Sequence, residues 1–297
     1  MRGWNRLALL KNKTRRVATR LGRLFLSRDE IVVSLTSYPR RINSVHRVVR
    51  SLFAQTMLPD RIVLYLSRDE FPNGEGGLPR ELLACRGHDF KIRWVEGNMR
   101  SHKKYLYAAR DYPDALVITV DDDIECRNTL VSELVEAHRR FPHAVCGVRC
   151  HVINFTSEGS IAAYNKWILE SGNHHPRTLN HPSMRLFPTS GAGMLLPPGS
   201  LPPQAFDEEA IKETCLNADD IWLKVMTALA GWPSLSIPGW QGVTTIEGTQ
   251  EDSLWSTNAK GGNDRAISAL RQWCLEHLGV SIDDLFKDDA LDDLLDP

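Results

Sequence analysis

The sequence predicts an α/β fold in which a mainly parallel β-sheet is flanked by helices. From residue 31 onward, short apolar segments rich in β-branched residues alternate with segments whose apolar residues recur at helical spacing. Each connection between successive strands is long enough to contain a helix, as parallel strands require. The composition, with 42% hydrophobic and 25% charged residues in a chain of 297, is that of a globular protein with a large core.

The expected elements follow one another in strand–helix order. Asn43 is a suitable N-cap for a helix whose apolar residues share one face. Residues 73–77, with the sequence NGEGG, are expected to form a flexible loop. The expected strands are residues 31–35, 61–66, 91–95, 116–120 and one near 144–153, and the helices between them begin at about 43, 102 and 129.

Polar residues follow several of these strands. Right-handed crossovers bring the carboxyl ends of parallel strands to one edge of the sheet, which is where open α/β sheets bind ligands. At that edge we expect Thr36–Tyr38, Ser67 and the acidic residues 121–123. No glycine-rich phosphate loop follows the first strand, which argues against P-loop and dinucleotide-binding folds.

Three consecutive aspartates end the fourth strand in the sequence LVITVDDDIE, residues 116–125. Adjacent carboxylates repel one another, and a hard divalent cation with oxygen ligands would offset that repulsion. The alternative is an acidic lead-in to the following helix, where negative charge is favourable at the helix N-terminus. A second acidic pair, Asp219 and Asp220, opens a later helix over residues 221–229, and these residues either cap the helix or form a second functional site.

The first thirty residues are strongly basic. They carry nine Lys or Arg against Asp29 and Glu30, a net +7, which leaves −8 for the rest of a chain whose net charge is −1. Their apolar residues recur at helical spacing, but no run is long enough to span a bilayer or to form a signal peptide. We expect a basic amphipathic helix that either lies on an anionic membrane surface through residues 1–28 or docks on the protein itself, against the acidic segment 281–297.

Together, these segments resemble a glycosyltransferase of the GT-A fold, and more narrowly the family 2-like enzymes of bacterial surface-polysaccharide synthesis. The resemblance covers residues 31–265. A lone D-x-D sequence is a weak signal, but the ordered set is specific. The segments that carry it are VSLTSYPRRI, SHKKYLYAAR, VITVDDDI, TSGAGMLLPP, ADDIWLKVM and GGND.

The resemblance implies a role for individual residues. Asp121 and Asp123 match the aspartates that hold Mn²⁺ or Mg²⁺ against the donor diphosphate, and Asp122 matches the residue that reaches the ribose. Asp220 matches the base that takes the proton of the acceptor hydroxyl, with Asp219 as its neighbour where the family commonly has Glu. The residues expected to bind the donor, besides Asp122, are Thr36, Ser37, Tyr38, Arg41, Lys103, Lys104, Gly191 and Gly193.

Several of these assignments have ordinary alternatives. Lys103 and Lys104 could lie on a solvated helix face, and Arg41 with its neighbour Arg40 could belong to a surface turn. Some GT-A enzymes use a late histidine as a metal ligand, but the only histidine after His181 is His277. The metal would then be held by aspartates, diphosphate and water. The histidine-rich loop, with His174, His175 and His181, is expected near the acceptor.

The resemblance implies an inverting, metal-dependent transferase that moves a sugar from a nucleoside-diphosphate donor to a glycan or lipid-linked acceptor. The expected organisation is a basic segment (1–30), a nucleotide-sugar half (31–153), an acceptor and catalytic half (154–265) and a C-terminal helix with an acidic tail (266–297). The alternatives are a sugar-phosphate nucleotidyltransferase and a non-catalytic carbohydrate-binding protein. We expect a cytoplasmic protein, peripheral on the inner face of the membrane, and no nucleic-acid partner because the body of the chain is acidic.

Overall fold

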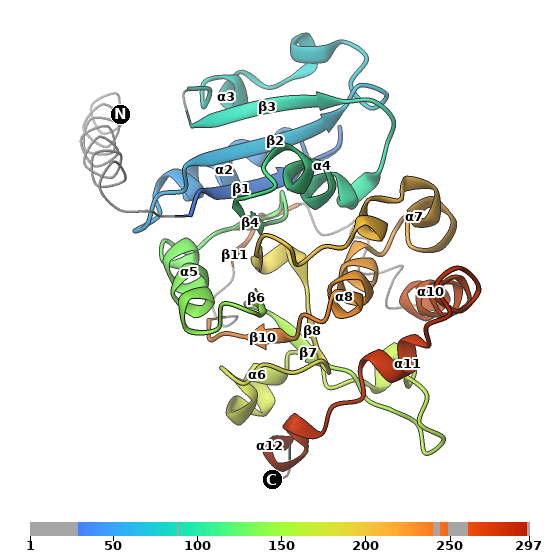
Figure 1. The fold of residues 1–297 in the computed structure, drawn as a ribbon. Helices are drawn as coiled ribbons and strands as arrows, with labels where there is room; N and C mark the ends of the chain where they lie inside the picture. Colours follow the sequence, from blue (N-terminus) through green and yellow to red (C-terminus); the bar gives the residue numbers. More distant parts are fainter. Residues whose placement is uncertain (1–28, 88, 240–243, 249–260, 296–297) are drawn as a thin grey trace.

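A seven-stranded sheet forms the centre of the protein (Figure 1). The computed structural model describes residues 29–87, 89–239, 244–248 and 261–295. The strand order is β10-β6-β9-β4-β1-β2-β3, and every neighbouring pair is parallel except the two that involve β9. The predicted mainly parallel α/β fold is therefore confirmed. The strands are β1 Ile31–Thr36, β2 Arg61–Ser67, β3 Phe90–Val95, β4 Leu116–Thr119, β6 Val145–Gly147, β9 Met194–Leu196 and β10 Ser234–Ser236.

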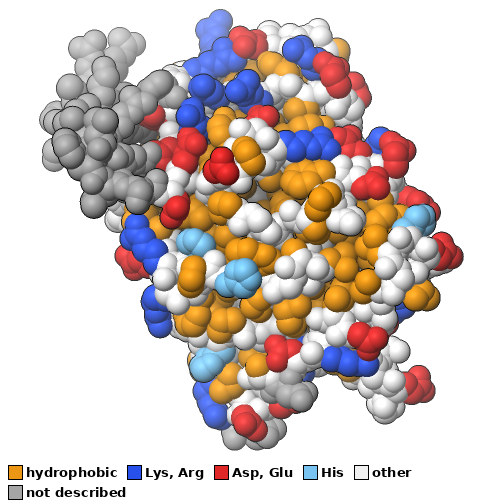
Figure 2. Space-filling view, in the orientation of Figure 1, with side chains coloured by type: hydrophobic (Ala, Val, Ile, Leu, Met, Phe, Trp, Pro, Cys, Tyr) orange, Lys and Arg blue, Asp and Glu red, His pale blue; other side chains and the backbone are white. Residues whose placement is uncertain are grey.

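Helices cover both faces of this sheet because consecutive strand residues point to opposite faces (Figure 1). Val32 belongs to a core that includes residues of α4, α7, α8 and α10, whereas Val33 belongs to a second core with residues of α2, α3 and α5. The space-filling view shows hydrophobic side chains across the middle of one face, with charged side chains mainly toward its upper and lower ends (Figure 2). The helices are α2 Val45–Phe53, α3 Arg80–Leu83, α4 Lys103–Asp111, α5 Leu130–Arg140, α7 Glu208–Thr214, α8 Asp219–Leu229 and α10 Asn263–Leu278.

The four strands predicted between residues 31 and 120 agree with β1 to β4 within one or two residues. The predicted helices correspond to α2, α4, α5 and α8. The segment 73–77 contains a short 3₁₀ helix, η1 Gly74–Gly77, and a second one, η2 Arg100–His102, precedes α4.

The prediction of one strand near residues 144–153 is wrong. The chain forms β6 in the central sheet and then β7, Cys150–Val152, which pairs with β8, Leu186–Pro188, in a separate antiparallel sheet. The break comes at Gly147, where a Cβ atom would lie 2.6 Å from Cβ of Pro188. Both strands are buried, and only Val148 and Arg149 separate them, so their sequences resemble one strand.

The acidic C-terminal segment packs on the second half of the chain. A carboxylate oxygen of Asp283, in α11 (Ile282–Leu285), accepts a hydrogen bond of 2.7 Å from the backbone N–H of Ile161, and the Asp283 carboxylate also pairs with Arg271. Asp288 accepts another from the backbone N–H of Met184 at 2.8 Å. The expected basic helix lies outside the described residues. No helix in the described ranges has both the length and the apolar composition of a bilayer-spanning segment.

Candidate active site

The carboxyl ends of six strands lie at one edge of the central sheet. β1, β2, β3 and β4 are parallel, and β6 is parallel to β4 because both are antiparallel to the strand between them, β9. β10 is parallel to β6. Thr36, Ser67 and the aspartates after β4 therefore lie at the same edge, as predicted. Since β9 runs in the opposite sense, its first residues also lie there, which brings the segment Thr189–Gly193 to the aspartates.

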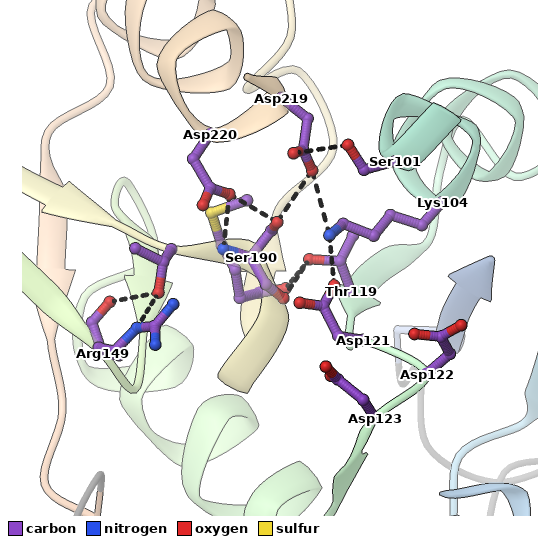
Figure 3. Close-up of polar contacts among 12 residues, drawn as sticks. Ser101, Lys104, Thr119, Asp121, Asp122, Asp123, Arg149, Ser190, Asp219 and Asp220 are labelled. Carbon is purple, nitrogen blue, oxygen red and sulfur yellow. Dashed lines mark hydrogen bonds and ion pairs between the residues drawn. The ribbon is translucent and has the colours of Figure 1, made fainter. Parts of the chain in front are cut away.

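The three consecutive aspartates divide between two sides of the chain. The carboxylates of Asp121 and Asp123 extend to the same side, and that of Asp122 extends elsewhere (Figure 3). Asp122 accepts hydrogen bonds from Oγ of Ser37 at 2.5 Å and from Nη1 of Arg41 at 3.0 Å. The same Nη1 lies 2.9 Å from Oδ2 of Asp123. Burial raises the pKa of Asp122, although Arg41 and Ser37 act against that shift.

Lys104 connects the aspartates after β4 to those that open α8. Its Nζ atom lies 2.6 Å from Oδ1 of Asp121 and 3.1 Å from Oδ2 of Asp219 (Figure 3). Burial alone would lower the pKa of this ammonium, but the surrounding carboxylates raise it above its ordinary value. The protein thus places one of its own cations between the two acidic sites.

The two lysines of α4 are not on a solvated helix face, so that alternative is wrong. Lys103 is 1% exposed and Lys104 is 2% exposed. Lys103 turns to a different partner from its neighbour, because its Nζ donates to Oε2 of Glu70 at 2.5 Å and to Oδ1 of Asn98 at 3.1 Å. The structure brings only Lys104 into direct contact with the aspartates.

Ser190 holds the second acidic pair in place. Its backbone N–H donates to Oδ1 of Asp220 at 2.8 Å, and its hydroxyl lies 2.6 Å from the same oxygen and 3.1 Å from Oδ2 of Asp219. The other oxygen of Asp219 accepts from Oγ of Ser101 at 2.8 Å. All of these partners lie outside α8, so the two aspartates do more than cap their own helix.

The environments of Asp219 and Asp220 push their pKa values apart. Burial would raise the pKa of Asp219, but Lys104 and His102 outweigh it and lower the value to about 2. Burial and the neighbouring Asp219 charge raise the pKa of Asp220 to about 6. Neighbouring carboxyl groups whose pKa values are driven apart are typical of sites in which the two groups have different acid–base roles. Asp219 stays ionised, and Asp220 can exchange a proton near neutral pH.

Two glycines at this edge of the sheet allow neighbouring side chains to lie close to the backbone. A Cβ atom on Gly191 would lie 2.1 Å from Oδ2 of Asp121, so only glycine leaves room for that carboxylate. The carbonyl of Gly191 accepts a hydrogen bond of 3.0 Å from the backbone N–H of Asp121. Gly193 has φ +115°, which other residues rarely adopt, and a Cβ atom there would lie 2.7 Å from Leu130.

The residues expected in the nucleoside pocket lie at the end of β1. The hydroxyl of Thr36 donates to the carbonyl of Tyr65 at 2.8 Å, which fixes the end of the strand. Tyr38 is half-buried, and the guanidinium of Arg41 lies 5.6 Å from its ring centroid. Tyr38 and Arg41 are thus close to one another and to Asp122.

Sequence reasoning missed four polar residues of the site: Ser101, Ser190, Thr189 and Arg149. Nε of Arg149 donates to Oγ1 of Thr189 at 2.7 Å, and the guanidinium lies beside the Ser190 segment in Figure 3. Thr189 and Ser190 belong to the TSGAG segment, and two hydroxyl residues directly before Gly191 were the available signal. Nothing in the sequence indicated the contacts of Ser101 and Arg149, because their partners are 118 and 40 residues away.

The carboxylates after β4 suit a divalent cation whose remaining ligands come from the substrate and from water. Asp121 and Asp123 offer hard oxygen ligands on one side of the chain, but in the described ranges no three His, Cys, Asp or Glu side chains group as metal ligands. Mg²⁺ usually keeps several waters and binds through one or two carboxylates plus substrate phosphates. The two aspartates fit that kind of site rather than a protein cage.

No protein-family model and no curated protein sequence matches this chain. Among solved structures, the mannosyltransferase PcManGT from Pyrobaculum calidifontis, in complex with GDP-Man and Mn²⁺, is similar with a TM-score of 0.49, 10% identity, and coverage of 90% of this chain and 68% of that one. The 4-diphosphocytidyl-2C-methyl-D-erythritol synthase from Anaerococcus prevotii has a TM-score of 0.46, 13% identity, and coverage of 78% and 96%.

A third similar structure is TarS of S. aureus, with a TM-score of 0.44 and 12% identity. The likeness covers 85% of this chain and 44% of TarS. All three TM-scores lie under 0.5, so these likenesses carry no argument about function.

Proposed function

We propose that the protein is an inverting, metal-dependent glycosyltransferase that moves a sugar from a nucleoside-diphosphate donor to a glycan or lipid-linked acceptor. One observation carries the proposal: two acidic sites, Asp121 with Asp123 and Asp219 with Asp220, lie at one sheet edge and share the buried cation Lys104. A transferase needs one site for the departing diphosphate and another for the attacking hydroxyl.

Asp220 takes the role of base. With a pKa of about 6 it is ionised at neutral pH, yet it is basic enough to accept a proton in the transition state. The acceptor oxygen attacks the anomeric carbon and passes its proton to Asp220. The bond from that carbon to the diphosphate breaks on the opposite face, and the electron pair leaves with the diphosphate. Ser190 fixes the carboxylate through two hydrogen bonds, so that Asp220 is oriented before the acceptor arrives.

The donor is held at the ends of β1 and β4. Ser37 and Arg41 orient Asp122 as a partner for the ribose, and Tyr38 offers a ring on which the base can stack. Within the described structure, the buried Nε of Arg41 has no hydrogen-bond partner, which suits a phosphate oxygen of the donor. Asp121 and Asp123 would hold Mn²⁺ or Mg²⁺, whose charge would stabilise the leaving diphosphate.

The nucleotidyltransferase alternative is less consistent with the second acidic site. The phosphate of a sugar phosphate is already an anion when it attacks, so that reaction has no need of Asp220. A non-catalytic carbohydrate-binding protein has no need of an acidic pair whose pKa values are driven apart.

The test is donor hydrolysis across UDP-, GDP- and CMP-sugars, with Mn²⁺, with Mg²⁺ and with EDTA. We expect one nucleoside-diphosphate sugar to be turned over only with metal, and Asp123→Asn to lose metal-dependent donor binding while keeping its fold by circular dichroism. Full turnover in EDTA would remove the metal from the proposal. Hydrolysis of none of these donors would remove the transferase function.

Asp220→Asn separates the two sites. It should bind donor as wild type does but transfer sugar on the order of 10²–10⁴-fold more slowly, which is the usual contribution of a general base. Calorimetry that shows weaker donor binding by this variant would move Asp220 into the donor site. The anomeric configuration of the product, read by NMR, tests inversion separately.

The basic, amphipathic sequence of residues 1–28, which lie outside the described residues, supports a proposal about the location of the enzyme. We propose a cytoplasmic enzyme that is peripheral on an anionic inner membrane face, where it meets a lipid-linked acceptor. Each basic residue near such a surface contributes roughly 1 kcal/mol. The full chain should sediment with anionic but not neutral liposomes, and less so as salt rises. Failure to sediment at low salt would instead support docking of this segment on the protein.

A further inference from the structure

A cavity of about 310 Å³ opens at the same sheet edge as the acidic sites. The chain leaves β6 through Val148 and Arg149 and leaves β10 through residues 237–239, and both exits line the cavity. The remaining wall comes from Cys150 of β7 and from residues 170–179, the segment that includes the helix α6 (Ser171–His174) and the start of the histidine-rich loop. The lining residues are Val148, Arg149, Cys150, Glu170, Gly172, Asn173, Leu179, Ile237, Pro238 and Gly239.

The cavity is linked to the proposed base by one short segment. Nε of Arg149 donates to Oγ1 of Thr189 at 2.7 Å, and the backbone N–H of Thr189 donates to the carbonyl of Arg149 at 2.9 Å. The next residue, Ser190, holds Asp220 (Figure 3). A ligand in the cavity would therefore lie beside the segment that orients the base. A larger cavity, of about 640 Å³, lies between residues 154–166 and the C-terminal segment, and none of the acidic-site residues line it.

The side chains of the cavity suit a small polyol with one apolar face. Val148 and Ile237 are buried and, with Leu179, form an aliphatic wall. Glu170 and Asn173 supply the polar side, with 3.3 Å between Nδ2 of Asn173 and Oε2 of Glu170. An ionised carboxylate only accepts hydrogen bonds, so Glu170 suits a ligand that brings hydroxyl donors. The cavity volume of about 310 Å³ is at the lower end of the range for ligand pockets, which indicates a ligand with a single sugar ring.

The backbone at Glu170 is held in an unusual conformation. Its φ is +50°, and its N–H donates to Nδ1 of His151 at 2.8 Å. Burial lowers the pKa of His151 to about 3, so the ring stays neutral and Nδ1 remains an acceptor. A non-glycine residue in this left-handed region of the backbone is strained, and the conformation persists where the surroundings hold it. His151 is such a support, and it fixes the start of the loop that carries Glu170.

We propose that this cavity binds the terminal sugar unit of the acceptor, a neutral hexose or N-acetylhexosamine ring. Glu170 and Asn173 hold its hydroxyl groups, the aliphatic wall covers its apolar face, and Arg149 borders the side that faces Ser190 and the base. The inference rests on the proposed function, because it is that reaction which requires an acceptor beside Asp220.

The experiment is saturation-transfer NMR of the full chain with four methyl glycosides, those of glucose, galactose, mannose and N-acetylglucosamine. At least one should bind, and Glu170→Gln and Asn173→Ala should each weaken that binding at least tenfold. Glu158→Gln is the matched control, because Glu158 is exposed and does not line the cavity; it should bind as wild type does. In transfer assays, Glu170→Gln should raise KM for the acceptor more than KM for the donor.

The outcomes separate this inference from the proposed function. If wild type hydrolyses a sugar nucleotide but no glycoside binds, or if Glu170→Gln and Asn173→Ala bind the glycosides as wild type does, the cavity is not the acceptor site and the transferase function stands. If the glycosides bind to wild type and more weakly to Glu170→Gln, but no sugar nucleotide is turned over, the cavity is a sugar-binding site and the proposed transferase function is wrong.

Discussion

Lys104 and Asp219 form an ion pair of 3.1 Å between residues that are 115 positions apart in the chain. The same ammonium pairs with Asp121. Lys104 therefore bridges an aspartate that follows β4 and an aspartate of α8, as Figure 3 shows. The two acidic sites are thereby coupled electrostatically, and a change of charge at one of them alters the electrostatic potential at the other.

Replacing Lys104 by methionine should destabilise the protein by about 3–5 kcal/mol, because it leaves buried carboxylates without their cation. Urea unfolding would measure the loss. Lys212→Met is the matched control, since Lys212 is an exposed lysine paired with Glu209, and it should unfold at nearly the same urea concentration as wild type. Equal effects of the two substitutions would show that the Lys104 bridge contributes little.

The rate of transfer should fall at acid pH with a midpoint near 6. Burial and the Asp219 charge raise the pKa of Asp220 to about 6, and the base is inactive once it is protonated below that value. Asp219→Asn removes one negative neighbour, so the acid limb should move to lower pH. The profile of kcat/KM against pH, measured for both proteins, checks this. An acid limb that stays in place in Asp219→Asn would assign it to another group.

Gly191→Ala should reduce donor turnover at least tenfold, because a Cβ atom at this position would lie 2.1 Å from Oδ2 of Asp121. The carboxylate must move, and with it the proposed metal ligand. Gly76→Ala is the control, since no atom lies within 4 Å of the corresponding Cβ position. Steady-state kinetics of both variants, with metal titrated, would show whether the loss comes from weaker metal binding. Wild-type kinetics in Gly191→Ala would show that the Asp121 carboxylate can move away from the added Cβ atom without loss of activity.

Stability should rise with pH between about 7 and 10 because of Lys224. This lysine of α8 is 2% exposed, donates to Oγ of Ser234 at 3.1 Å and lies 5.2 Å from the ring centroid of Phe286. Burial lowers its pKa to about 7, from an ordinary value of 10.5. Between those values the unfolded chain binds the extra proton, so the folded state gains up to about 1.4 kcal/mol per pH unit as pH rises.

Lys224→Met should remove that dependence and be more stable than wild type near pH 7, with the difference shrinking toward pH 10. Urea unfolding of both proteins at several pH values measures it. Lys287→Met, at an exposed lysine that follows Phe286 in the sequence, should keep the wild-type slope. A wild-type slope in Lys224→Met would show that the buried lysine keeps its ordinary pKa.

The fold and the acidic residues were predictable, whereas the partners of those residues were not. Strands β1, β2 and β4 are rich in apolar β-branched residues, so their sequences predict buried strands, and they are buried. Lys103 and Lys104 show the limit, because helical spacing assigns a charged pair to solvent and only tertiary contacts with Glu70 and Asp121 explain their burial. Ser101 and Arg149 belong to the same class, since a hydroxyl or a guanidinium carries no periodic signal.

The central position of β9 has a consequence for the order in which the chain assembles. β6 is made before β9 and β10, yet among the described residues these later strands are its two neighbours in the central sheet. A nascent chain ending at residue 153 could pair β1 to β4, but it would leave β6 unpaired and the apolar edge of β4 open. An exposed edge strand has unpaired backbone N–H and C=O groups that can pair with another chain, so such an intermediate is prone to aggregation. Folding during synthesis therefore has to wait for residues 194–236, and separate expression of residues 31–153 and 154–265 should yield two insoluble pieces rather than two domains.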